Sequence, residues 1–178
     1  MTENNSIIIK VIKVYSHKFN NKTMKSYLIL FIFVFLSCSK NDTVFEPQTE
    51  FEPQTETDIL KYIEDNNLNA TKSSSGLYYV INNEGTGIRP TSNSNVTVAY
   101  KGYYLDGNVF DQSNAAGISF GLNQVIKGWT EGITYFREGG DGILLIPYNL
   151  GYGEIGHARS GIPGGAVLVF DVKLIRVN

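Results

Sequence analysis

The sequence is poor in the residues on which much enzyme chemistry depends: among 178 residues it has one cysteine, two histidines and one tryptophan. A single cysteine excludes an internal disulfide framework. Only His157 follows Cys38, and no ordering of serine, histidine and aspartate favours a catalytic triad. One histidine and no further cysteine argue against a transition-metal site, so we expect neither a metal nor a cofactor.

A basic cluster is also missing from the larger part of the chain. Residues 1–37 carry five lysines and one glutamate, whereas residues 38–178 carry 10 basic and 16 acidic residues, a balance of −6. This acidic balance argues against nucleic-acid binding. The glycine-rich Gly151-Tyr-Gly153 lacks the lysine and the following helix of a phosphate-binding loop.

The N-terminal part has the pattern of a signal peptide. Residues 1–23 show no helix caps, and translation from Met24 would make this extension dispensable. From Met24, a short positive region precedes the apolar residues 27–36, a run too short to span a membrane. Residues 24–37 are therefore predicted to be a signal peptide, and residues 1–37 to contribute nothing to the folded domain.

Phe35-Leu-Ser-Cys38 resembles the lipobox of a bacterial lipoprotein, although leucine is usual where Phe35 stands. The resemblance implies lipidation of Cys38 and anchorage in the cell envelope, on the periplasmic side of the inner or the outer membrane. A signal anchor with an incidental cysteine is the alternative.

Residues 38–57 contain a tandem hexapeptide, Phe-Glu-Pro-Gln-Thr-Glu, at 45–50 and again at 51–56. Pro47 and Pro53 interrupt helix and strand, and the glutamates repel one another, so we expect a disordered acidic tether. Two copies are too few to form a structural repeat array.

Residues 58–75 are predicted to form a short helix and a linker. Thr57 or Asp58 can cap the helix, which would end near Asn66. Its shared apolar face consists of Ile59, Leu60 and Ile63. A polar, serine-rich link follows, and we expect the folded domain to occupy residues 76–178.

Residues 76–178 alternate apolar and polar side chains with the period of two that is typical of strands. The expected strands are 77–81, 95–105, 109–111, 118–122, 142–147 and 166–177. One face of the second strand holds Val96, Val98, Tyr100 and Gly102; one face of the last holds Leu168, Phe170, Val172 and Leu174. This order predicts an α+β fold, a curled antiparallel sheet (a half-barrel) wrapped around one short helix.

That helix is expected within residues 124–132, Gln-Val-Ile-Lys-Gly-Trp-Thr-Glu-Gly, where Val125, Ile126 and Trp129 follow helical spacing. Such a lone helix must bury its apolar stripe against the sheet. Trp129 either fills the core, as most buried tryptophans do, or forms the floor of a pocket.

Several ordered motifs resemble the FKBP-type peptidyl-prolyl cis–trans isomerases. They are Val98-Ala-Tyr-Lys-Gly102, Asp106-Gly-Asn-Val-Phe-Asp111, Val125-Ile-Lys-Gly-Trp129, Gly151-Tyr-Gly153, Ile162-Pro163 and Leu168-Val-Phe-Asp-Val172. The resemblance covers about residues 76–178 and implies an FKBP-like fold. It also implies isomerase activity on X–Pro bonds, with proline-containing polypeptides as substrates, macrolides as inhibitors and a monomeric state.

Carried over to this sequence, the resemblance implies a proline pocket with a defined set of residues. Catalytic positions would be Tyr100, Phe110, Asp111, Ile126, Trp129, Tyr152 and Phe170. Substrate-binding positions would be Phe120, Val125, His157 and Ile162. The chain departs from the family pattern at Ile118, where an aromatic is usual, and in a slightly longer loop after Tyr152. A tethered module that binds proline segments, or acts as a chaperone without turnover, would need the same pocket.

Overall fold

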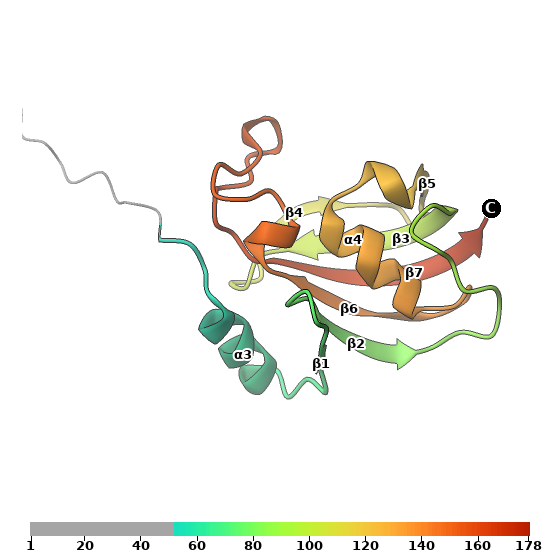
Figure 1. Ribbon diagram of the computed structural model, residues 1–178, viewed down its shortest axis with the longest axis horizontal. Coiled ribbons are helices and arrows are strands. Elements are labelled where there is room, and N and C mark those ends of the chain that lie inside the picture. Colours follow the sequence, from blue (N-terminus) through green and yellow to red (C-terminus); the bar gives the residue numbers. More distant parts are fainter. Residues whose placement is uncertain (1–51) are drawn as a thin grey trace, which may run out of the picture. The chain divides into compact units, whose positions relative to one another are not determined.

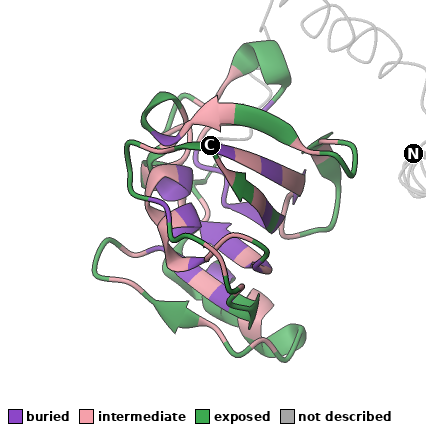
Figure 2. Ribbon diagram, turned by 90° about the vertical axis from the view of Figure 1, so that its right-hand side faces the viewer, coloured by how far each residue is buried: buried purple, intermediate pink, exposed green. Residues whose placement is uncertain are grey.

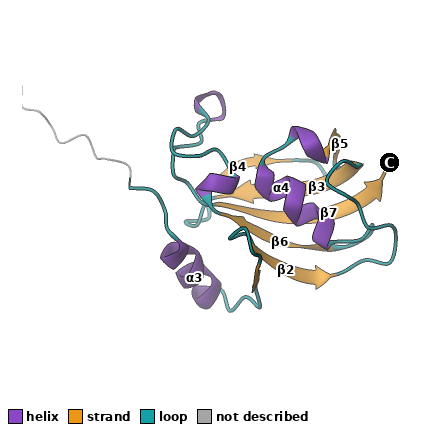
Figure 3. Cartoon of the chain, viewed as in Figure 1, coloured by secondary structure: helices purple, strands orange, loops and turns teal. Residues whose placement is uncertain are grey.

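The computed structural model describes residues 52–178, which form one sheet of seven strands (Figures 1 and 3). The strands are β1 (Thr71–Lys72), β2 (Tyr78–Asn83), β3 (Asn95–Tyr103), β4 (Val109–Gln112), β5 (Ile118–Gly121), β6 (Asp141–Ile146) and β7 (Leu168–Val177). The predicted signal peptide 24–37, the lipidation site Cys38 and the first hexapeptide lie outside the described residues.

The sheet is antiparallel throughout, in the order β1-β2-β6-β7-β3-β4, and β5 also pairs with β3. The last strand of the chain therefore lies between β6 and β3. This register places Phe170 opposite both Gly102 of β3 and Leu144 of β6. The predicted fold class, an α+β half-barrel, is confirmed, and the six expected strands lie within a few residues of β2 to β7. Strand β1 was not expected, because residues 71–72 were assigned to the linker.

Two helices lie on opposite faces of the sheet, α3 (Glu56–Asp65) and α4 (Lys127–Gly132). Successive side chains of a strand point to opposite faces, so Leu144 packs in the core around α4 and Leu145 in the core around α3. The alternation of buried and partly exposed residues along the strands is visible in Figure 2. The sheet is thus apolar on both sides over much of its centre.

The short helix α4 approaches the sheet closely because glycines face it. A Cβ atom added to Gly128 would lie 2.4 Å from Ile146 Cγ2, and one added to Gly132 would lie 2.7 Å from the Leu144 methyls. The helix begins at Lys127, later than the apolar spacing suggested, because Ile126 has extended backbone angles (φ −61°, ψ 150°). Val125 and Ile126 therefore precede the helix, and both line the cavity described below.

The N-terminal limit of the folded part differs from the prediction. Helix α3 is capped by Thr55, neither by Thr57 nor by Asp58, because the Asp58 carboxylate accepts a hydrogen bond from the Thr55 N–H at 2.6 Å. The expected tether over residues 38–57 is therefore wrong at its C-terminal end, where residues 54–57 belong to the folded part. Ile59 is 1% exposed and packs with Tyr78 and other residues of the outer sheet face, so α3 belongs to the folded domain.

Between residues 52 and 178, no helix has both the length and the apolar character that crossing a lipid bilayer requires.

Candidate active site

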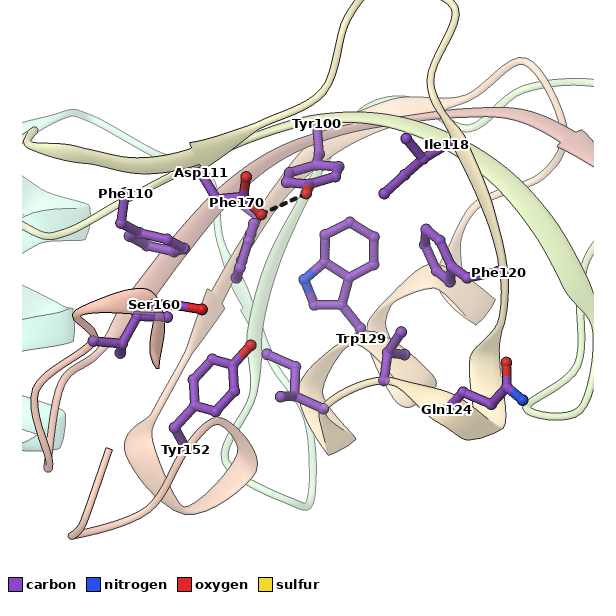
Figure 4. A pocket seen from close by; sticks show the side chains of 13 residues that line it. Tyr100, Phe110, Asp111, Ile118, Phe120, Gln124, Trp129, Tyr152, Ser160 and Phe170 are labelled. Atoms are coloured by element: carbon purple, nitrogen blue, oxygen red, sulfur yellow. Dashed lines mark hydrogen bonds between the residues drawn. The ribbon is translucent and has the colours of Figure 1, made fainter. Parts of the chain in front are cut away.

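A cavity of about 710 Å³ lies between α4, the curled sheet and the loop of residues 148–165, which we call the pocket loop. Figure 4 shows aromatic side chains from distant parts of the chain converging on it. Its lining consists of Tyr100, Phe110, Asp111, Ile118, Phe120, Gln124, Val125, Ile126, Trp129, Tyr152, Ser160, Ile162 and Phe170. Cavities of this size and apolar character are typical of sites for small ligands or single side chains.

Trp129 forms the floor of the cavity and is also part of the core. Trp129 is 5% exposed, and its ring meets those of Tyr100 and Phe170 edge to face, each with ring centroids 5.1 Å apart. Phe120 lies 5.4 Å away on another side. Each of these pairs has the geometry that aromatic quadrupoles prefer. Both interpretations of Trp129 therefore apply: the indole is part of the core, and it also lines the cavity.

Gly102 makes room for two of the aromatic walls. A Cβ atom at this position would lie 2.7 Å from the Phe170 ring and 2.8 Å from the Phe110 ring. Because the strand has no side chain here, these two rings can pack edge to face at 5.5 Å and 88°. The wall of the cavity thus depends on the absence of a side chain at Gly102 as well as on the aromatic rings.

A hydrogen bond joins two polar groups at the edge of the cavity. The Tyr100 hydroxyl donates to Asp111 Oδ2 at 2.6 Å (Figure 4). Burial raises the pKa of the Tyr100 phenol above its usual value, and the hydrogen bond to the Asp111 carboxylate adds to this effect. The phenol is consequently neutral at physiological pH and its proton is directed toward Asp111.

The pocket loop contributes Tyr152, whose hydroxyl points into the cavity in Figure 4. Burial raises the pKa of Tyr152, and the negative charge of Asp111 raises it further, so this hydroxyl is a neutral donor. The Tyr152 ring stacks on His157 with centroids 5.0 Å apart, and His157 Nδ1 lies 2.8 Å from the Ser160 hydroxyl. His157 thus packs against the Tyr152 ring without lining the cavity.

Ile126 lines the cavity at the start of α4. It is the N-cap of α4, and its carbonyl accepts hydrogen bonds from Trp129 and Thr130. Its own N–H precedes the helix, where the first amide groups have no acceptor within the helix. The site therefore combines an apolar, aromatic interior with a few fixed donors.

The structure brings ten of the eleven sequence-predicted pocket residues to the cavity lining; His157 alone is not among the lining residues. Sequence reasoning missed Gln124 and Ser160. Gln124 ends a 3₁₀ turn, Leu122–Gln124, and Ser160 ends another, Ala158–Ser160. Neither turn has a hydrophobic pattern from which the placement of these two side chains at the cavity could be predicted. Ile118, the departure from the family pattern, lines the cavity beside Phe120.

The part of the chain that the structure describes contains no group of three or more histidine, cysteine, aspartate or glutamate side chains that could hold a metal ion. The cavity combines an apolar, aromatic lining with the hydroxyls of Tyr100 and Tyr152 and the Asp111 carboxylate.

The chain has a curled antiparallel sheet around a short helix, with an aromatic cavity between them. Comparison with known protein families identifies the class of proteins to which this fold and cavity belong. Residues 87–175, half of the chain, match the family of FKBP-type peptidyl-prolyl cis-trans isomerases. The chain belongs to this family.

Individual relatives agree with this assignment. A probable FKBP-type peptidyl-prolyl cis-trans isomerase FkpA of Neisseria meningitidis is 49% identical over 108 residues, which cover 60% of this chain and 39% of that protein. The crystal structure of FkpA from Escherichia coli has a TM-score of 0.63 at 29% identity, covering 99% of this chain and 82% of the other. A peptidyl-prolyl cis-trans isomerase from Pseudomonas syringae has a TM-score of 0.60 at 30% identity, covering 71% and 98%.

The region matched in the Neisseria relative is less than half of that protein's length. The similarity therefore applies to the folded domain around the cavity.

Proposed function

We propose that the protein is a peptidyl-prolyl cis-trans isomerase that acts on X–Pro bonds of exported or envelope proteins. The observation that carries the proposal is the cavity of about 710 Å³ with Trp129 as its floor and Phe110 and Phe170 as its walls. This cavity lies within the region that matches the isomerase family.

Isomerisation suits a site of this kind because it makes and breaks no covalent bond. Resonance holds the peptide bond planar, with a rotation barrier of about 18–20 kcal/mol. X–Pro bonds populate both isomers but exchange over tens of seconds or longer. The planar amide is more dipolar than the twisted amide, so transfer from water to an apolar cavity favours the twist.

The residues of the cavity divide this task. Trp129 and Phe170 enclose the proline ring, and Phe110 excludes water from the amide. The Ile126 N–H and the Tyr152 hydroxyl donate to substrate carbonyls and hold the torsion, as preorganised donors do in other enzymes. Asp111 acts on the substrate through its charge, or serves only as the acceptor for Tyr100; a double-mutant cycle described in the Discussion separates these roles.

Turnover is the property that separates this proposal from a proline-segment binding or chaperone module. A protease-coupled assay on a short X–Pro peptide should show catalysed cis-to-trans conversion that saturates with peptide. Phe110→Ala should reduce kcat/KM strongly because it opens the cavity to water. A protein that binds the peptide without accelerating conversion would support the module instead.

We further propose that the mature protein is anchored in the cell envelope through lipid on Cys38. The support is the sequence of residues 24–38, a short positive region, an apolar run and a terminal cysteine. One acyl chain binds membranes only marginally, so durable anchorage requires more than one chain. Expressed with its leader, the protein should partition into detergent, and Cys38→Ser should release it or stall its processing. A mature protein that begins elsewhere would refute the anchor.

The same cavity should accept macrolide inhibitors, in competition with proline peptides. We also expect the folded domain to be monomeric. Light scattering tests the monomeric state. Measurement of the inhibition constant of a macrolide against a proline peptide tests the competition. A dimer, or a macrolide that binds without displacing peptide, would contradict these expectations.

A further inference from the structure

Gln54, within the second hexapeptide, forms hydrogen bonds with a segment far along the chain. The Gln54 N–H donates to the Gly165 carbonyl at 2.9 Å, and Gln54 Oε1 accepts from the Val167 N–H at 2.7 Å. Backbone and side chain of one residue thus hold both ends of a three-residue segment. No role in the isomerase mechanism above requires this contact.

The contact supplies an acceptor to a buried donor. Gly165 is buried and Val167 is 0% exposed, and a buried backbone N–H without an acceptor is costly. The Val167 side chain lies in the same outer core as Ile59 of α3. The N-terminal segment therefore holds residues 165–167 through side-chain packing as well as through hydrogen bonds.

Residues 165–167 connect the end of the pocket loop to β7, and we call them the base of the loop. The Gly165 N–H donates to the Gly153 carbonyl at 2.8 Å, and Gly153 directly follows Tyr152. Downstream, β7 begins at Leu168 and carries Phe170 into the cavity wall. A continuous set of hydrogen bonds and covalent links therefore connects Gln54 with two residues that line the cavity, Tyr152 and Phe170.

The residues that follow Gln54 are also held in the folded domain. The next residue, Thr55, caps α3, and Glu56 accepts hydrogen bonds from Lys72 and Tyr78. Five residues after Gln54, Ile59 anchors the helix in the outer core. The first hexapeptide has the same residues, but five positions after Gln48 stands Pro53, which cannot supply that anchor.

We propose that Gln54 is a positioning residue for the reaction: it fixes the base of the pocket loop and thereby the place of Tyr152 at the substrate. The proposal rests on the isomerase function proposed above. It assigns to the segment before α3 a part in substrate binding, although this segment lies on the outer face of the sheet and does not line the cavity.

Amide hydrogen exchange on the full-length chain tests the positioning without reference to activity. In Gln54→Ala, the amide of Val167 loses its acceptor and should exchange about fivefold faster or more, since a net hydrogen bond of about 1 kcal/mol corresponds to that factor. The amide of Gly165, which donates to the Gly153 carbonyl, should also exchange faster because the segment that holds it is less firmly fixed. The amides of Trp129 and Thr130 in α4 should keep their rates. Gln54→Glu retains an acceptor oxygen and should restore the exchange rates toward those of the wild type.

Kinetics on the same variants test the consequence for the reaction. In Gln54→Ala, KM for an X–Pro peptide should rise severalfold while kcat changes little, because Trp129 and Phe170 remain in place. The matched control is Gln48→Ala, the same substitution in the same hexapeptide sequence, and it should behave as the wild type.

Unchanged exchange at Gly165 and Val167 in Gln54→Ala would overturn the proposal. So would a rise that includes Trp129 and Thr130, an unchanged KM, or an equal effect of Gln48→Ala. If the wild type binds the peptide without turnover, the isomerase function fails by itself. The peptide dissociation constant then takes the place of KM, and the exchange experiment still decides the role of Gln54.

Discussion

The Tyr100 hydroxyl and Asp111 Oδ2 lie 2.6 Å apart at the edge of the cavity, and the hydroxyl donates. Asp111 is exposed, so this bond should contribute only about 1 kcal/mol to stability. If Asp111 acts only as acceptor for Tyr100, then Tyr100→Phe and Asp111→Ala should each lower kcat/KM a few fold, and the double variant should be no worse than either. The measurement is a double-mutant cycle on kcat/KM.

A different outcome would assign a direct role to Asp111. If Asp111→Ala lowers kcat/KM by the same factor in the wild type and in Tyr100→Phe, the two residues act independently. The carboxylate then influences the substrate through its charge and not through the tyrosine.

Trp129 should contribute to both stability and binding, because its ring is 5% exposed and also forms the floor of the cavity. Trp129→Leu should fold but lose about 2 kcal/mol or more of the free energy of unfolding. It should also bind a proline peptide about tenfold more weakly, which corresponds to about 1.4 kcal/mol. Trp129→Phe is the matched control with smaller losses of both kinds. Urea denaturation and calorimetric titration separate the two effects, and a variant that lost only stability would show that the indole has no part in binding.

The N-terminal limit of the domain can be tested by truncation. A chain that begins at Glu52 should have the melting temperature of the full-length chain. A chain that begins at Thr71 should still unfold cooperatively but at lower temperature, because removal of α3 exposes the outer core around Tyr78, Leu145 and Val169. Ile59→Ala should reproduce most of the loss, about 2–5 kcal/mol. Equal melting temperatures for the two truncated chains would show that α3 adds nothing to stability.

Partly buried tyrosines should make the fold sensitive to alkali. Burial, followed by hydrogen bonding to carboxylates, raises the pKa of Tyr100 and raises that of Tyr135 to about 12. In the unfolded chain these phenols lose their protons near pH 10. Between these values the unfolded state binds fewer protons than the folded state, so the free energy of unfolding falls as pH rises.

We therefore expect no contribution of these phenols to the pH dependence of stability from pH 6 to about 9, and a decline above about pH 10. Melting curves recorded by circular dichroism at several alkaline pH values provide the measurement. Tyr135→Phe removes one of the phenols and should decline less steeply. A stability that increased above pH 10 would contradict the assignment.

Much of the fold was predictable from the sequence because its strands are half-buried and alternate cleanly. In β3, Val96, Val98 and Gly102 are buried as the period of two required. The aromatic cavity was likewise predictable, because its residues lie in short motifs that each resemble the isomerase family. The resemblance to the family predicted that these motifs meet at one cavity, because their spacing along the chain does not show it.

The remainder depended on contacts that local sequence does not encode. Thr55, Thr57 and Asp58 are all acceptable helix caps, so residue type alone does not choose among them; in the structure, Thr55 is the cap and forms a capping box with Asp58. The contact of Gln54 with Val167 joins residues 113 positions apart. His157, expected at the substrate, instead stacks on Tyr152 because the loop folds back through the bridge between His157 and Ile162.

The most direct test of the proposed mechanism is the pH dependence of kcat/KM for an X–Pro peptide, measured for the wild type and for His157→Ala. Rotation about the amide bond transfers no proton, and the raised pKa values of Tyr100 and Tyr152 keep both hydroxyls neutral over this range. The account predicts a nearly flat profile between about pH 6 and 8 and a His157→Ala variant that remains active. A bell-shaped profile, or loss of activity in a folded His157→Ala variant, would show that the site works by acid–base chemistry and not by desolvation of a rotating bond.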